Sequence, residues 1–347
     1  MAPQQRARTS FLLLSLLAAS LAPTARGSSQ GLYAIAPVTA QLLLVNESIG
    51  TRSPVGPGLA ALGWVVPSDC SPTATDTTGK WLYTFARRAA AAPAAATPWS
   101  VLALELRDGS IRKEYQLPAA FPPSLDACEH GLAEDGAWHA YVSAVTRSAA
   151  QQAPRVVVWR FTYTWPESNE SVPLIDAPLA ALGMGAAPAG ALSTTVTNFS
   201  WWISLADGLA GVDLQTLAPS QTLPLPAAAG AAAGARIEGL QYDISGEPRA
   251  IYCVLTSAAG RSSVLRFVDA GGSGVVPAST VTISPAAVPA APDAANRVAL
   301  VNDRSAIAIV SNSSILTLDV NGNLLSRAPA CGIGGCPIAI AYEPFVF

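Results

Sequence analysis

The sequence predicts an all-β protein, on three observations. No stretch keeps a hydrophobic period of 3.6 residues, which is the pattern of an amphipathic helix. Short runs rich in Val, Ile, Leu, Trp and Tyr recur instead, bounded by Gly, Pro, Asp, Asn and Ser, and this is the pattern of strands separated by turns. The 347 residues also include 28 Pro and 27 Gly, a density that interrupts long helices.

One kind of run recurs at regular intervals and indicates a repeat architecture. Each example is aromatic or β-branched and lies after a polar turn. The runs are LYAIAP from Leu32, WLYTFARR from Trp81, WHAYVSAV from Trp138, WWISLAD from Trp201, AIYCVLTS from Ala250 and AIAIVSN from Ala306. Their starts are about 50 to 60 residues apart, a period expected of propeller blades rather than of helical solenoids.

Further runs around these segments complete a four-stranded unit. After four of them comes a strand that carries an acidic residue, centred on Glu105, Asp213, Val268 and Asp319. Before three of them lies an apolar strand that ends in an acidic turn, GWVVPSD from Gly63, GLQYDISGE from Gly239 and RVALVND from Arg297. Four consecutive strands, a to d, are the blade of a β-propeller.

The phrasing of two blades resembles a known superfamily. GLQYDISGEPRAIYCVL and SILTLDVNGNLLS are similar to blades of β-propellers of the YVTN and WD-repeat type, and the resemblance covers nearly all of the chain after its first residues. No WD dipeptide or other family-defining motif is present, so the resemblance is one of architecture and implies no particular activity.

We therefore expect a single propeller domain over residues 28–347, with six four-stranded blades. The expected blades are 31–57 together with 336–347, then 58–122, 123–176, 182–226, 236–285 and 296–330. Seven blades, with an unrecognised one in 177–198, are the alternative. Nothing before Leu32 supplies strand a of the first blade, and CPIAIAYEP from Cys336 fits that place. The C-terminal strand is thus expected to close the ring, which removes its two free edges.

The first 27 residues have the pattern of a secretory signal peptide. Arg6 and Arg8 precede the apolar run Phe11–Ala22, and small residues offer cleavage after Gly27, with Ala22 or Ala25 as alternatives. The run is shorter than the roughly 20 apolar residues of a membrane span, and an uncleaved anchor is the alternative. No later segment predicts a span, and the net charge of −3 predicts no bulk attraction to nucleic acid. We expect a secreted, extracellular protein.

Secretion gives meaning to the glycosylation sequons and the five cysteines. The sequons begin at Asn46, Asn169, Asn198 and Asn312. Cys331 and Cys336 flank a Gly-rich loop before the closing strand, and we predict that they pair. Cys70 and Cys128 are expected in similar a–b turns of neighbouring blades and form a candidate second pair; other pairings stay open. Cys253 lies within a strand and is predicted to be a buried free thiol.

Blade topology assigns each loop to a face, and the arginines gather on one of them. We call the face from which b–c and d–a connections emerge the top face; most long inserts fall there. Its candidate ligand-binding residues are Arg87, Arg88, Arg147, Arg155, Arg236, Arg261 and Arg297, together with Trp202 as a sugar-stacking ring. Guanidinium groups suit carboxylate or sulfate ligands. The alternative interpretation is that Asp prefers tight turns and Arg lies along strand ends.

Catalytic patterns are sparse. The two histidines, His130 and His139, belong to one blade. His130, beside Asp126 and Glu129, is a candidate base or metal ligand; the alternative is an exposed turn histidine and a strand histidine. No nucleophile elbow, zinc-protease, P-loop or dinucleotide motif occurs.

Two classes of function remain. We favour a secreted binding or scaffold module whose partner is an extracellular protein or glycan. The arginines favour an anionic ligand, and no cofactor is required. The alternative is a propeller hydrolase, similar to calcium-dependent lactonases, with a divalent metal such as calcium in the central channel.

Overall fold

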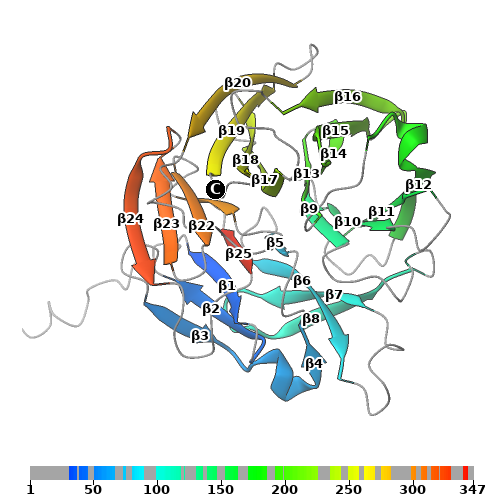
Figure 1. Ribbon diagram of the computed structural model, residues 1–347. Coiled ribbons are helices and arrows are strands. Elements are labelled where there is room, and N and C mark those ends of the chain that lie inside the picture. The colour runs from blue at the N-terminus through cyan, green and yellow to red at the C-terminus, as the bar shows by residue number, and fades with distance from the viewer. Residues whose placement is uncertain are drawn as a thin grey trace, which may run out of the picture.

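Six antiparallel β-sheets surround a common axis in the computed structural model (Figure 1). The all-β propeller with six blades is thus confirmed. The structure describes residues 31–36, 39–45, 51–66, 73–75, 80–89, 99–118, 121, 130–135, 139–146, 153–162, 171–185, 192–197, 199–225, 235–243, 249–257, 262–269, 275–282, 298–301, 306–310, 314–319, 321–329 and 339–342.

Each sheet places its strands in order from the axis outward. The innermost strands, a, are β25 (Ala339–Tyr342), β5 (Thr73–Thr75), β9 (His130–Glu134), β13 (Thr194–Val196), β17 (Arg236–Asp243) and β21 (Val298–Val301). A further short strand of the second blade, β4 (Trp64–Val65), lies toward the rim of the ring (Figure 1). The second strands, b, are β1 (Leu32–Ala36), β6 (Trp81–Arg88), β10 (His139–Thr146), β14 (Ser200–Ser204), β18 (Ala250–Thr256) and β22 (Ala306–Val310).

The two outer positions complete each blade. The third strands, c, are β2 (Gln41–Val45), β7 (Ser100–Glu105), β11 (Arg155–Thr162), β15 (Gly208–Asp213), β19 (Ser262–Asp269) and β23 (Ser314–Asp319). The outermost strands, d, are β3 (Arg52–Val55), β8 (Ile111–Gln116), β12 (Ser171–Pro178), β16 (Pro219–Pro224), β20 (Val275–Thr282) and β24 (Leu324–Pro329).

The ring is closed by the two ends of the chain. β25 pairs antiparallel with β1, with Tyr342 opposite Leu32 and Ala339 opposite Ile35. The predicted closure is confirmed, because the C-terminal strand takes the innermost place of a blade whose other strands come first in the sequence. In Figure 1 the red β25 lies beside the blue β1.

The seven-blade alternative is wrong. The stretch 177–198, the expected place of an extra blade, contains the end of β12, the 3₁₀ turn η4 (Leu179–Leu182) and β13, which is the inner strand of the fourth blade. A second 3₁₀ turn, η1 (Leu59–Leu62), lies at the equivalent place between the first and second blades. Both turns connect strand d of one blade with strand a of the next.

The second blade departs from the expected pattern at its inner strand. The run from Gly63 was expected to form one strand a, but two short strands pair with β6, and of these β5 lies near the axis and β4 toward the rim (Figure 1). β4 pairs with the end of β6, where Trp64 lies opposite Arg88, and β5 pairs further along β6, where Thr73 lies opposite Thr84. The residues between β4 and β5 include Pro67 and Pro72, which supply no N–H for a continuous ladder.

The buried core lies between blades rather than within them. Six clusters of buried residues occur in the described part of the chain, and each joins neighbouring blades. Successive strand residues point to opposite faces of a sheet, so a fully buried strand contributes to two clusters. β14 illustrates this, because Trp201 packs toward the third blade and Trp202 toward the fifth. None of the described helices is long and apolar enough to cross a bilayer.

Candidate functional site

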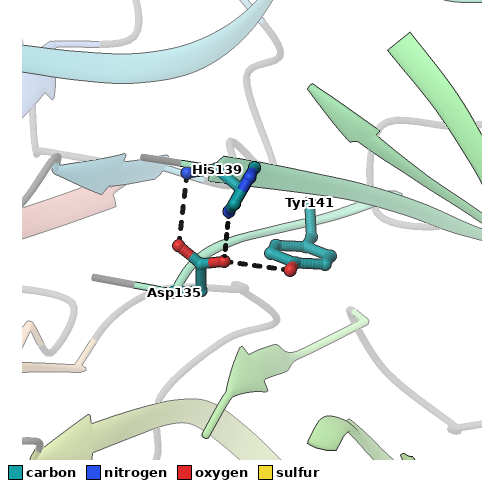
Figure 2. Close-up of polar contacts among 3 residues, drawn as sticks. All are labelled: Asp135, His139 and Tyr141. Atoms are coloured by element: carbon teal, nitrogen blue, oxygen red, sulfur yellow. Dashed lines mark hydrogen bonds and ion pairs between the residues drawn. The ribbon is translucent and has the colours of Figure 1, made fainter. Parts of the chain in front are cut away.

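A cluster of three polar side chains lies at the a–b turn of the third blade (Figure 2). The Nδ1 atom of His139 lies 2.7 Å from Oδ2 of Asp135, and the hydroxyl of Tyr141 donates to the same oxygen at 2.9 Å. The backbone N–H of His139 donates to Oδ1 of Asp135 at 3.2 Å. One carboxylate therefore receives bonds from both side chains and from the backbone of the turn.

The local fold explains why these residues meet. Asp135 follows directly after β9, and its backbone N–H donates to the carbonyl of His139 at 3.3 Å, so the turn is closed from both strands. His139 and Tyr141 are two apart on β10 and therefore lie on the same face of the sheet. Burial, and then the Asp135 carboxylate, raise the pKa of Tyr141 well above its ordinary value. The phenol is a hydrogen-bond donor at neutral pH.

The chemistry of this cluster is that of an oriented imidazole. A carboxylate on Nδ1 holds the ring and its tautomer, which leaves Nε2 available to a ligand or a proton acceptor. The contacts also close a tight turn, and this structural role accounts for all of them. The sequence interpretation of His139 as a strand residue is correct, but the partnership with Asp135 and Tyr141 was missed; the D-x-x-x-H-x-Y spacing across an expected turn was the available signal.

The other histidine corrects the sequence interpretation. His130, expected to be a base, a metal ligand or an exposed turn residue, is the first residue of β9 and is 1% exposed. Its ring packs against Phe85 and Phe121, with ring centroids 4.9 and 6.3 Å away. Asp126 and Glu129, its expected partners in a base or metal site, lie outside the described residues. Burial between two aromatic rings makes His130 a core residue at the second and third blades.

Four of the seven candidate arginines are described, and each lies at a strand end on the top face. Arg87 and Arg88 end strand b of the second blade, Arg155 begins strand c of the third, and Arg236 begins strand a of the fifth. Arg147, Arg261 and Arg297 lie outside the described residues. The four described arginines come from three blades, so no single close-packed cluster follows from their strand positions.

Two of these arginines form ion pairs on their own blade. Arg88 Nη2 lies 3.2 Å from Oε2 of Glu114, and Arg155 Nη2 lies 2.6 Å from Oδ1 of Asp176. The carboxylates belong to the outermost strands. Such exposed pairs contribute about 0–1 kcal/mol each to stability. They also reduce the positive charge that the top face presents.

Two tryptophans hold guanidinium groups at the end of β6. The Cζ atom of Arg88 lies 3.9 Å from the centroid of the Trp64 ring, and that of Arg87 lies 4.8 Å from the Trp99 ring. Stacking on an aromatic face restricts the rotation of a guanidinium group. These stacks were not predicted from the sequence, because Trp64 and Trp99 are distant from the arginines along the chain.

The prediction that Trp202 is a sugar-stacking ring is wrong. Trp202 is 2% exposed and packs between the fourth and fifth blades with Leu209 and Ile251. Trp201 is buried on the opposite face of the same sheet. Neither ring faces solvent, because both sides of an inner propeller strand meet a neighbouring blade. The two indoles are core residues.

Several carboxylates on the opposite face stabilise turns. Asp108 accepts the N–H of Ser110, Asp213 accepts those of Gln215 and Thr216, and Asp319 those of Asn321 and Asn323. Hydrogen bonds from the turns lower the pKa of all three carboxyl groups, from Ser110 for Asp108, from Thr216 for Asp213 and from Asn323 for Asp319. The interpretation of Asp as a turn former therefore holds at these positions.

The described cysteine agrees with its prediction. Cys253 is a free thiol, 1% exposed, in β18, and burial raises its pKa. The predicted pairs Cys331–Cys336 and Cys70–Cys128 lie outside the described residues. Strand bounds correct the expected location of the second pair: Cys70 lies between β4 and β5, and Cys128 precedes β9, so neither occupies an a–b turn.

The asparagines of the four sequons also lie outside the described residues. Asn46 and Asn169 fall between strands c and d, Asn198 between a and b, and Asn312 between b and c. Among the described residues, no group of three or more His, Cys, Asp or Glu is placed to hold a metal ion.

Comparison with known proteins supports the fold. No protein-family model matches the chain, and no curated protein matches its sequence. A functionally unknown protein from Desulfotomaculum acetoxidans DSM 771 is similar in structure, with a TM-score of 0.53 and 12% identity over 91% of this chain and 86% of that one. At this identity the likeness shows a shared fold and no function.

Two further solved structures have lower TM-scores. The β-propeller domain of Cps50 (Swd1) from Myceliophteria thermophila has a TM-score of 0.44 and 14% identity over 85% of each chain. AofleA from Arthrobotrys oligospora has a TM-score of 0.46 and 14% identity over 75% of this chain and 71% of that one.

Proposed function

We propose that the chain is a secreted, N-glycosylated propeller that acts as an extracellular binding or scaffold module. Its ligand surface is the top face, built from the b–c and d–a connections, and its ligand is an anionic extracellular protein or glycan. The observation that carries the proposal is the position of Arg87, Arg88, Arg155 and Arg236, which all lie at strand ends on that face. Loops on a rigid scaffold are the usual location of binding sites.

The described charges and the positions of the glycosylation sequons support the top face over the opposite one. Three described carboxylates of the opposite face, Asp108, Asp213 and Asp319, accept hydrogen bonds from their own turns. Three of the four sequons also fall in connections of the opposite face. Glycans at Asn46, Asn169 and Asn198 would leave the top face as the side of approach.

The test has two parts, secretion and anion binding. The full-length chain is expressed in a eukaryotic host; the protein is expected in the medium, shortened by the residues before the cleavage site and carrying glycans removable by peptide N-glycosidase. The purified protein is then applied to a heparin column at about 50 mM salt, where guanidinium–sulfate contacts are weakly screened. Retention that is lost when Arg87, Arg88, Arg155 and Arg236 are changed to Gln is the expected result. Flow-through of the wild type would reject the anionic ligand.

A further inference from the structure

We propose that the top end of the second blade docks an acidic peptide segment that carries an aliphatic side chain. The surface is the blade 2 corner, defined as Leu62, Val65, Arg87 and Arg88. This inference rests on the proposed function, since it names a partner and a place on the same face. An acidic peptide is complementary to a corner that offers exposed aliphatic groups beside two guanidinium groups.

The aliphatic half of the corner is exposed to solvent, whereas the equivalent leucine in the second copy of the same turn is buried. Leu62 is 43% exposed and Val65 40%. The equivalent of Leu62 in the second 3₁₀ turn is Leu182, which is 8% exposed in the buried cluster that joins the third and fourth blades. The same sequence, LAALG, therefore buries its second leucine at one junction and presents it at the other.

The basic half is positioned before any ligand arrives. Arg87 and Arg88 are each stacked on a buried tryptophan, Trp99 and Trp64 respectively. A guanidinium held in this way loses less side-chain entropy on binding a carboxylate than a freely rotating one. Arg88 donates to Glu114 through one nitrogen, which uses one of the five donors of its guanidinium.

The strand register brings the two halves together. Val65 lies opposite Arg87 and Trp64 opposite Arg88 in the β4–β6 pair, so each opposed pair shares one face of the sheet. The N–H of Ala89 donates to the carbonyl of Gly63 at 2.7 Å, which joins the turn of Leu62 to the end of β6. A segment crossing this end of the sheet meets one guanidinium from each face, with Leu62 and Val65 beside them.

The chemistry of the corner favours a peptide over a glycan. Sugars stack their apolar faces on exposed aromatic rings. Trp64 and Trp99, the rings at this corner, are buried and lie beneath the guanidinium groups. The exposed apolar groups are aliphatic, which suits a leucine-like side chain flanked by carboxylates.

Three fluorescein-labelled synthetic peptides of about twelve residues test the proposal: alternating Glu and Leu, alternating Glu and Ser, and alternating Lys and Leu. Binding to the purified protein is followed by fluorescence anisotropy at about 50 mM salt. We expect the Glu–Leu peptide to bind at least about tenfold more tightly than the Glu–Ser peptide, a difference of about 1.4 kcal/mol. No binding of the Lys–Leu peptide is expected.

Two variants locate the site, with a matched control for each. Leu62→Ser with Val65→Ser, and separately Arg87→Gln with Arg88→Gln, are each expected to weaken Glu–Leu binding about tenfold or more. Leu325→Ser changes another exposed leucine, on β24, and Arg107→Gln removes an exposed arginine from the c–d turn on the opposite face of the second blade; both are expected to bind as the wild type does. Circular dichroism confirms that each variant is folded.

The outcomes separate this inference from the proposed function. If heparin retains the protein but neither corner variant weakens Glu–Leu binding, or if Glu–Ser binds equally well, the corner is not the docking site and the top-face function stands. If a corner variant lowers heparin retention and Glu–Leu binding fails altogether, the partner is a glycan and the peptide proposal is wrong. If the protein is not secreted or passes through the heparin column, the proposed function itself fails, whatever the peptides do.

Discussion

The junctions between the first and second blades and between the third and fourth blades use the same short sequence. Leu-Ala-Ala-Leu-Gly occurs at 59–63 and again at 179–183, and both copies form a 3₁₀ turn that ends in a left-handed glycine. The first N–H of each turn donates to the b–c connection of the preceding blade, from Leu59 to Ala40 and from Leu179 to Pro154. The five-residue sequence and this hydrogen bond to the preceding blade are thus shared by both junctions.

The two junctions differ in the residues that come after the turn. β4 begins at Trp64, directly after Gly63, whereas Gly183 is followed by Met184 and by further chain before β13 begins. Leu182 packs in one buried cluster with Met184 and Leu192, while Leu62 belongs to no buried cluster and Trp64 supplies the buried side chain instead. A shared local motif therefore determines the turn, and the neighbouring blade determines which of its side chains is buried.

The largest effect should come from a change that affects both junctions at once. Deletion of 337–347 removes β25, the inner strand of the first blade. This strand pairs with β1 and so closes the ring. We expect loss of cooperative folding of the whole propeller, because every blade depends on two neighbours for its buried faces. Thermal unfolding followed by circular dichroism measures this.

A deletion variant that still unfolds in one sharp transition at the wild-type temperature would show that the junctions fold independently of ring closure. Restoring the strand as a separate peptide of residues 331–347 should recover part of the transition if closure is the cause.

The second leucines provide the direct test of the difference between the junctions. Leu182→Ala should lower the free energy of unfolding by about 2 kcal/mol or more, because it leaves a cavity among buried side chains. Leu62→Ala should change it by less than about 0.5 kcal/mol, because Leu62 is exposed. Urea denaturation of the two variants compares them, and equal losses would contradict the distinction in burial.

Alkaline pH should weaken the third–fourth junction through Tyr141, which belongs to the same cluster as Leu179 and Leu182. Its pKa is raised in the folded protein, so above its ordinary value near 10 the unfolded chain loses a proton that the folded chain keeps. The folded state then binds more protons, and this contribution to stability declines as pH rises, by up to about 1.4 kcal/mol per pH unit.

Tyr141→Phe removes this titration and also the hydrogen bond to Asp135. The stability advantage of the wild type over Tyr141→Phe should therefore be constant below about pH 9 and shrink between about pH 10 and 12. Denaturation at a series of pH values measures the difference, and a difference that does not change with pH would contradict the raised pKa.

The smallest difference in stability between the two junctions is expected at the glycines that end the 3₁₀ turns. Gly63 and Gly183 have φ values of 78° and 65°, and a Cβ at either position would meet no atom within 4 Å. Alanine at each should cost about 1 kcal/mol from backbone strain alone, and nearly the same at both junctions. Equal losses in urea denaturation support a shared turn; a much larger loss at one glycine would mean that its surroundings differ more than the described contacts show.

Much of the fold could be predicted because its signals are local and repeated. Strand runs recur at a blade period, and the missing first strand of the first blade has a match in the C-terminal run that became β25. The inner strand of the second blade was less predictable, since the choice between one strand and the pair β4 and β5 depends on how much of β6 each pairs with.

The candidate site was predicted less well, because side-chain surroundings come from other blades. Strand order was enough to place Arg87, Arg88, Arg155 and Arg236 on one face. It was not enough to show that Trp202 is buried by the fifth blade, that His130 packs between Phe85 and Phe121, or that Trp64 and Trp99 lie under arginines.

The sequence by itself determined the strand period, the propeller architecture and the closing strand, since each depends on residues close together in the chain or on a repeat along it. Only the tertiary structure decided the burial of Leu182, the exposure of Leu62 and the partnership of Asp135 with His139 and Tyr141. The physical reason is that a propeller buries its apolar surface between blades, so the environment of a side chain is set by residues about 50 positions away along the chain.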